Sequence, residues 1–213
     1  GLSTLEMVES CIRHLLQRTK GVENPTYDDV RSWYNKNLHP DVIDLEDKAV
    51  YKHIFHKGNF VGIFQFTNEG AQKFCKSAKP NNIIDISAIT SIYRPGPLSA
   101  KVDQEYTKAK KNPDGIHYVN DVVKEVTSET AGFLIFQEQI ALLAHKLGKD
   151  ISLDEGNLLR KLLTKKGTGK GAQEKEKIRV KFVDGCLEKG IDRATSGAMW
   201  KKFEYFSGYG FNK

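Results

Sequence analysis

The residues best suited to chemistry in this sequence are cations, which gather between positions 160 and 181, where acids are few. Arginine binds phosphate oxygens through a planar, two-pronged guanidinium, whereas lysine binds them as a point charge. Lys161 and Lys165 are four residues apart, so a helix would place both on one face. Two interpretations are equally supported by this spacing. One is a phosphate-binding face, and the other is a solvated helix whose C-terminal cations offset the helix dipole. The cations are Arg160, Lys161, Lys165, Lys166, Lys170, Lys175, Lys177, Arg179 and Lys181.

One further arginine precedes two prolines in the stretch "IYRPGPL", residues 92–98. Each proline fixes its own φ and restricts the residue before it to an extended conformation. We therefore expect Arg94 to leave an apolar stretch on a stiff, non-helical support.

Enzyme motifs are weak along the rest of the chain. A phosphate-binding P-loop needs Ser or Thr after Gly-Lys, but Gly169-Lys170 is followed by Gly171. His53 and His56 share a helical spacing, yet a zinc site needs more ligands, so we interpret them as partly exposed histidines. We expect Asp44 and Asp47 to be solvated loop charges. The residues alone predict no catalytic constellation and no bound metal.

Composition limits the choice of partners and compartment. The 213 residues carry a formal charge of +6 and a pI of about 9.1, which favours polyanionic partners, with ordinary surface charge as the alternative. Three cysteines, far apart, are typical of a reducing compartment rather than a disulfide framework. No apolar run is long enough for a membrane span, so we expect a cytoplasmic protein without membrane contact. The first residue is Gly rather than Met, which favours a fragment or a processed product.

The elements that must position these residues are predicted to be mainly α-helices, in a multi-helix domain with one or two short strands or extended segments. Ser-x-x-Glu capping boxes are expected at Ser3 and Ser152, and a short helix is expected from Thr26 through Trp33. The run at 60–66 is apolar and β-rich, so it is expected to be a short strand or a buried extended segment. Further helices are expected at 48–58, 68–79, from Gln137 onward, at 174–190 and at 194–206, with a break at 167–173.

Several stretches together resemble one family, the bacterial C-family replicative DNA polymerases, represented by the α subunit of DNA polymerase III. "GNFVGIFQFTNEG" resembles the family's G-x-x-x-G-V-F-Q-x-E-S-x-G, and "DISAITSIYRPGPL" resembles D-I-x-A-x-x-A-L-Y-R-P-G-P-L. "TAGFLIFQEQIALLA" is similar to T-x-G-V-x-V-Y-Q-E-Q-V-M-x-I-A, and "LDEGNLLRKLLTKK" to L-x-x-A-D-x-L-R-R-A-M-G-K-K. "KFVDGCLEKGID" and "FSGYGFNK" resemble F-x-x-G-x-x-x-x-G-I and F-A-G-Y-G-F-N-K. These blocks keep the family's order and rough spacing over most of the chain.

The resemblance implies the fingers region of such a polymerase, which binds the incoming deoxynucleoside triphosphate (dNTP) and primer–template DNA during replication. It places the catalytic palm aspartates and their Mg²⁺ outside this chain, so the segment binds no cofactor and is expected to be inactive alone. It also implies a first part at residues 1–120 and a second, basic part at residues 121–213. The implied partners are the palm and thumb, with the sliding clamp and clamp loader meeting other regions.

The resemblance also assigns roles to individual residues. Arg94 is expected to contact the nucleotide, and the alternative, which does not depend on the resemblance, is that it pairs with a buried carboxylate such as Asp85. Gln137 and Glu138 organise the site without touching the nucleotide, and Tyr209 and Gly210 shape the nucleotide pocket. Lys170, Lys175 and Arg179 are expected to contact the DNA backbone. The expected nucleotide contacts are Arg94, Arg160, Lys161, Lys165, Lys166, Tyr209 and Lys213.

The sequence also departs from the family pattern. Lys161 replaces the second arginine of an Arg-Arg pair and so lacks the planar fork, and Thr164 stands where the family has Gly. These departures favour a divergent member, encoded by a phage or another mobile element. One alternative is a stand-alone helical module that binds DNA or a partner without catalysis, and a remoter one is an enzyme of another class.

Overall fold

The chain forms two compact units, residues 1–83 and 84–213. The computed structural model describes residues 2–164, 169–207 and 210–213. Nearly all regular structure among these residues is helical, which confirms the predicted mainly α fold. The unit boundary lies between Ile83 and Ile84. The expected division between residues 120 and 121 is functional and stays a prediction.

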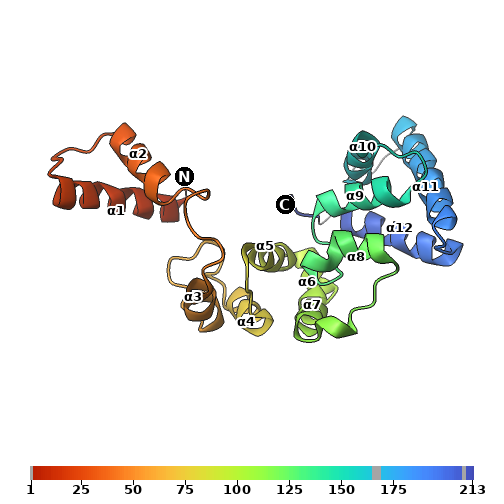
Figure 1. Cartoon of the computed structure of the whole chain (residues 1–213), viewed down its shortest axis with the longest axis horizontal. Helices are drawn as coiled ribbons and strands as arrows, with labels where there is room; N and C mark the ends of the chain where they lie inside the picture. The colour runs from red at the N-terminus through yellow and green to blue at the C-terminus, as the bar shows by residue number, and fades with distance from the viewer. Residues whose placement is uncertain (1, 165–168, 208–209) are drawn as a thin grey trace. The chain divides into compact units, whose positions relative to one another are not determined.

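The first unit begins with a helical hairpin, α1 (Ser3–Lys20) and α2 (Tyr27–Asn37), which lie side by side in Figure 1. Their contact buries Ile12, Leu16 and Val30. Thr26 and Asp29 form a capping box, so the expected start of α2 is confirmed, although the helix runs past Trp33. The capping box expected at Ser3 is wrong, because Leu2 holds the extended N-cap position and Ser3 is already helical.

The remainder of the first unit contains α3 (Lys48–Val50), a π-helical turn (Tyr51–His56) and α4 (Glu69–Ala78). The stretch at 60–66 is neither a strand nor continuously buried, since Val61 is 99% exposed and two tight turns interrupt it. Gly62 and Gln65 have positive φ, which breaks the extended geometry that a strand needs. Phe60 and Phe66 stack instead, with ring centroids 5.4 Å apart.

The unit boundary falls one residue into α5 (Ile83–Ile92), and the second unit continues with α6 (Pro95–Ser99) and α7 (Val102–Lys111). Arg94 is extended (φ −138°, ψ 153°), as the following proline predicts. Pro95-Gly96-Pro97 is not the expected non-helical support but the first turn of α6, because proline is well suited to the first helical position. A 3₁₀ turn (Pro113–Gly115) then leads to α8 (Asp121–Thr127) and a second 3₁₀ turn (Ser128–Thr130).

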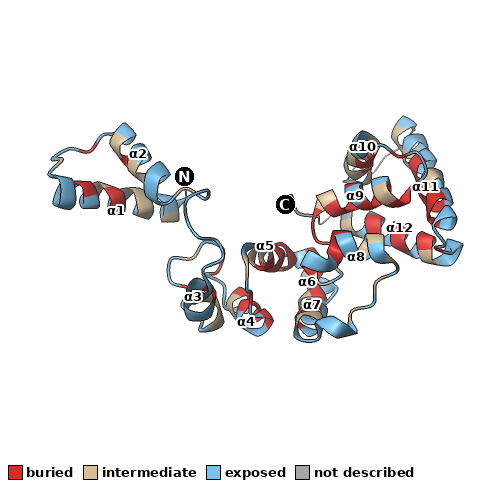
Figure 2. Cartoon of the chain, viewed as in Figure 1, coloured by how far each residue is buried: buried red, intermediate tan, exposed pale blue. Residues whose placement is uncertain are grey.

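Four helices form the core of the second unit: α9 (Gln137–Leu147), α10 (Leu153–Thr164), α11 (Lys170–Glu188) and α12 (Arg193–Ser207). Figure 2 shows buried residues along the faces that these helices turn toward one another. Helix α11 begins at Lys170, so part of the expected break at 167–173 is helical. The capping box at Ser152 is confirmed, with Glu155 N–H donating to Ser152 Oγ over 3.1 Å. Fully buried core residues include Leu143, Leu147, Leu159, Phe182, Cys186 and Phe203.

Helices α9 and α10 pack very closely at a glycine. A Cβ atom at Gly156 would lie 2.5 Å from the carbonyl oxygen of Ala141, so only glycine permits this approach. Arg160 follows Gly156 by four residues and therefore lies one turn further along α10. The close contact brings Arg160 to the first turn of α9, where the candidate site lies.

Candidate functional site

Residues that are far apart in sequence meet where α9 begins. Phe136, just before α9, pairs with Phe211 in an isolated parallel bridge, the one β-type pairing among the described residues. Gln137 N–H donates to the Phe211 carbonyl over 2.9 Å, and Phe211 N–H donates to the Ile135 carbonyl over 3.2 Å. The bridge attaches the segment 210–213 to α9, so the "FNK" residues lie beside the "FQEQ" residues.

Arg160 lies at the centre of this junction. Its Nη1 donates to Gln137 Oε1 over 2.9 Å and to Asn212 Oδ1 over 3.1 Å. Glu138 Oε1 lies 3.8 Å from the same nitrogen. The arginine side chain is 23% exposed, and its buried Nε has no hydrogen-bond partner among the described residues. Neutral amides therefore orient the guanidinium, and the nearest carboxylate is only loosely paired with it.

Gly210 fits closely against Gln137. The Gln137 Nε2 donates to the Gly210 carbonyl over 2.9 Å. A Cβ atom at position 210 would lie 2.6 Å from Gln137 Cγ, well inside van der Waals contact. Gln137 thus binds Arg160 through its oxygen and the 210–213 segment through its nitrogen.

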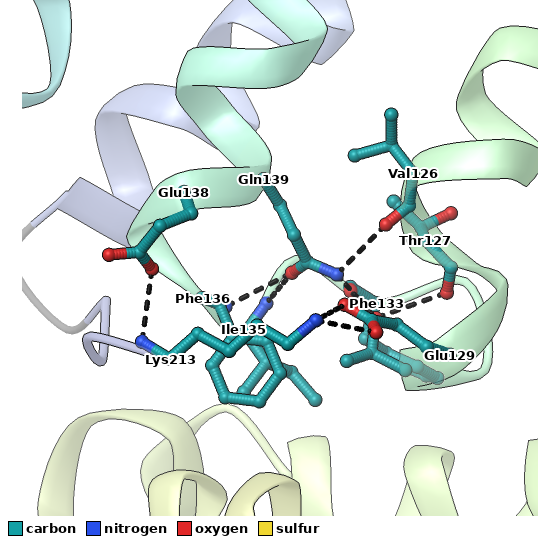
Figure 3. A network of polar contacts seen from close by, with 10 residues as sticks. Val126, Thr127, Glu129, Phe133, Ile135, Phe136, Glu138, Gln139 and Lys213 are labelled. Atoms are coloured by element: carbon teal, nitrogen blue, oxygen red, sulfur yellow. Dashed lines mark hydrogen bonds and ion pairs between the residues drawn. The ribbon is translucent and has the colours of Figure 1, made fainter. Parts of the chain in front are cut away.

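Lys213 is held by two carboxylates (Figure 3). Its Nζ lies 2.7 and 2.8 Å from the two carboxylate oxygens of Glu129, and its backbone N–H donates to Glu138 Oε2 over 3.1 Å. The ammonium also lies 5.9 Å from the centroid of the Phe136 ring, within reach of a cation–π attraction. The side chains of Lys213 and Glu129 are 40% and 34% exposed, so solvent reaches the pair.

Arg94 reaches the same junction from the start of α6. Its guanidinium carbon lies 5.8 Å from the centroid of the Phe211 ring. One cation therefore lies near each ring of the bridge, Lys213 near Phe136 and Arg94 near Phe211.

Asp85 is the carboxylate considered as an alternative partner of Arg94. It contacts Lys110 at 2.5 Å and accepts a hydrogen bond from the Tyr106 hydroxyl over 3.3 Å. Burial, and then the Asp85 charge, raise the pKa of Tyr106.

Other predicted residues lie outside this junction. Lys161 is exposed on α10, and Lys170 is exposed at the start of α11. On α11, Lys175 pairs with Glu204 at 3.0 Å and Arg179 pairs with Glu176 at 2.5 Å. Lys165, Lys166 and Tyr209 lie outside the described residues. The structure brings together Arg94, Gln137, Glu138, Arg160, Gly210 and Lys213.

Sequence reasoning missed Glu129, Gln139 and Asn212. Glu129 and Lys213 are 84 residues apart, and no local pattern indicates their pairing. Gln139 carries two signals, its match to the second glutamine of the family's Q-E-Q and its place at the third position of α9, and it is only 2% exposed. Among the described residues, no group of three or more His, Cys, Asp or Glu could hold a metal ion. Within the same described part of the chain, no helix is long and apolar enough to cross a membrane.

Comparison with known proteins gives consistent matches. Residues 8–190 match the family described as the bacterial DNA polymerase III alpha subunit finger domain. The DNA polymerase III subunit alpha of Campylobacter jejuni is 32% identical over 213 residues, which cover 100% of this chain and 16% of that protein. The counterpart from Borreliella burgdorferi is 36% identical over 181 residues, 84% of this chain and 15% of that protein. The protein of Halalkalibacterium halodurans is 32% identical over 184 residues, 86% of this chain and 16% of that protein. The chain spans about one sixth of the length of these curated relatives.

Proposed function

We propose, starting from the fact that this chain belongs to the bacterial DNA polymerase III α subunit finger-domain family, that it binds an incoming dNTP and primer–template DNA during replication. The membership bears out the resemblance seen in the sequence. The proposal adds which ligands the segment binds and which residues bind them.

The convergence on Arg160 carries the proposal. Separate sequence blocks supply Arg160, the Gln137 amide that orients it and the neighbouring Asn212. Because neutral amides hold the guanidinium, most of its positive charge is left for an external anion. Phosphoryl transfer depends mainly on positioning and on stabilising charge at the phosphates, and a preoriented arginine supplies both. We assign Arg160 to the triphosphate of the nucleotide.

The neighbouring cations complete the nucleotide site. Lys213 and Arg94 approach the same bridge, each against an aromatic ring, and both contribute charge toward the triphosphate. Lys161 adds a point charge from the exposed side of α10. Lys165, Lys166 and Tyr209 belong to the same proposed site through their family positions, and Gln137 and Glu138 organise it.

DNA binds through the cations of α11. Lys175 and Arg179 are four residues apart and share a helix face, and Lys170 precedes them on the same helix. Their ion pairs with Glu204 and Glu176 are partly exposed, so phosphates can replace the carboxylates at modest cost. This binding is independent of base sequence and weakens as salt rises.

The chemistry of bond formation lies elsewhere in the polymerase. The palm supplies the aspartates that hold Mg²⁺, and this segment supplies position and charge, so it is inactive alone. Its partners are the palm and thumb, while the clamp and clamp loader meet other regions.

Ternary-complex formation tests the proposal. The intact polymerase that carries this segment is titrated with a primer–template ending in a dideoxynucleotide, with and without the matching dNTP. Arg160→Ala is expected to abolish the dNTP-dependent tightening and to leave binary DNA binding intact. Lys175→Ala with Arg179→Ala is expected to weaken both complexes and to reduce the salt slope. Lys149→Ala, which removes an exposed pair with Glu188, is the matched control. Undiminished tightening in Arg160→Ala would refute the nucleotide assignment.

A second candidate is a helical DNA-binding module without a nucleotide site. The exposed cations of α11 favour it, since they do not depend on the junction at Arg160. This alternative predicts salt-sensitive DNA binding that ignores added dNTP in every variant.

A further inference from the structure

Gln139 is a buried amide in the first turn of α9 whose hydrogen-bonding groups all have partners. Its Oε1 accepts from the backbone N–H groups of Ile135 and Phe136 over 2.9 and 3.0 Å. Its Nε2 donates to the Val126 carbonyl over 3.2 Å and to Thr130 Oγ1 over 2.7 Å. Figure 3 shows the Gln139 side chain reaching from α9 to the extended segment and to the end of α8. A buried polar group with every bond made is a rigid connection between the elements it joins.

The two N–H groups that Gln139 binds belong to the segment on which the candidate site is built. The Ile135 carbonyl accepts from Phe211, and the next residue, Phe136, forms the bridge with it. No regular strand supports residues 135 and 136 among the described part of the chain, so Gln139 and the bridge with Phe211 hold them in place.

We propose that Gln139 is a positioning residue for nucleotide binding: it fixes the 135–136 segment, which seats residues 210–213 beside Arg160. The inference rests on the proposed function, because the seated segment carries Asn212 and Lys213. Gln139 is only 2% exposed, so it acts through the segment that it binds rather than by direct contact with the nucleotide.

Replacing Gln139 with glutamate distinguishes a positioning role from a general contribution to packing. A carboxylate can accept from Ile135 and Phe136, but it can donate neither to Val126 nor to Thr130. A protonated carboxyl group recovers one donor, and burial favours the protonated form. Gln139→Glu therefore keeps the size of the side chain while making one of its two donated hydrogen bonds depend on pH.

The experiment measures KM for dNTP and kcat in the intact polymerase that carries this segment, at about pH 6 and about pH 9. Gln139→Glu is expected to raise KM about tenfold at the higher pH, because one buried polar group is then left without its partner. At the lower pH its KM is expected to approach the wild-type value. Gln139→Leu is expected to have a raised KM at both pH values. The wild type gives the reference profile, since Glu129, Glu138 and Lys213 adjoin the same network. Gln104→Glu, an exposed position on α7, is the matched control.

The outcomes distinguish failure of the positioning role of Gln139 from failure of the nucleotide site itself. If Arg160→Ala raises KM while both Gln139 variants keep the wild-type KM at both pH values, the positioning role is refuted. A Gln139 variant that melts earlier but retains the wild-type KM also refutes it, since Gln139 is then only structural. If Arg160→Ala leaves KM unchanged, the nucleotide site itself is refuted and the positioning role falls with it.

Discussion

Arg160 donates a hydrogen bond of 2.9 Å from Nη1 to Oε1 of Gln137, a residue 23 positions earlier in the chain. This contact exists because Gly156 lets α10 approach α9 closely and because Gln137 is the first residue of α9. Gln137 also holds Gly210, so one amide joins two segments of the site. Substitutions that disturb this amide should therefore affect nucleotide binding without touching a charged residue.

Gly210→Ala tests the fit against Gln137. The new Cβ atom would lie 2.6 Å from Gln137 Cγ and displace the side chain from Arg160. We expect KM for dNTP in the intact polymerase to rise about fivefold or more, as for the loss of one hydrogen bond. Gly197→Ala is the control, because open space surrounds that position on α12 and alanine should stabilise the helix by about 0.5–1 kcal/mol. Equal KM values for both variants would show that the contact is unimportant.

Glu129→Gln tests whether this carboxylate competes with phosphate for Lys213. The carboxylate 2.7 Å away partly neutralises the ammonium and competes with a triphosphate for it, so its removal should favour the nucleotide. We expect KM for dNTP to fall about twofold to fivefold at low salt, with the effect fading as salt rises. Glu188→Gln, which breaks the exposed pair with Lys149, should leave KM unchanged. A higher KM in Glu129→Gln would mean that the carboxylate holds Lys213 in its productive position.

Thiol labelling of the 213-residue chain tests the packing of both units. Burial raises the pKa of Cys75 to about 12 and that of Cys186 to about 11, while Cys11 is exposed. Since only the thiolate reacts, one thiol should label quickly at about pH 8 and two only after denaturation. Cys11→Ser should remove the fast phase. A fast phase that persists in this variant would contradict the burial of the other two thiols.

The helices are largely predictable because their signals are local. The start of α2 after Thr26, the capping box at Ser152 and the start of α9 at Gln137 follow from short patterns. The apolar run at 60–66 does not form the expected strand because two residues adopt positive φ and the phenylalanines pack on one another. Pro95 does not exclude a helix after Arg94, since proline at the first helical position begins α6.

The candidate site is predictable as a set of cations but not as an arrangement. Sequence blocks identify Arg94, Arg160 and Lys213. Glu129 lies outside the blocks, and Gln139 lies within one of them without an assigned role. Glu129 acts through a contact with Lys213, 84 residues away, that forms only when the chain folds, and a single sequence carries no local sign of it. Gln139 contacts residues three and four positions earlier, so a glutamine at the third position of α9 is a local sign that sequence reasoning did not use.

The most direct test of the central claim is single-turnover incorporation by the intact polymerase, with dNTP concentration varied for wild type, Arg160→Lys and Arg160→Ala. Lysine keeps the charge but loses the planar fork, so its dissociation constant for dNTP should lie between the other two. We predict a value about tenfold or more above wild type for alanine, in keeping with a lost charge-assisted hydrogen bond. The three proteins should bind primer–template with the same affinity. A dissociation constant for dNTP that is identical in all three would contradict the assignment of Arg160 to the triphosphate.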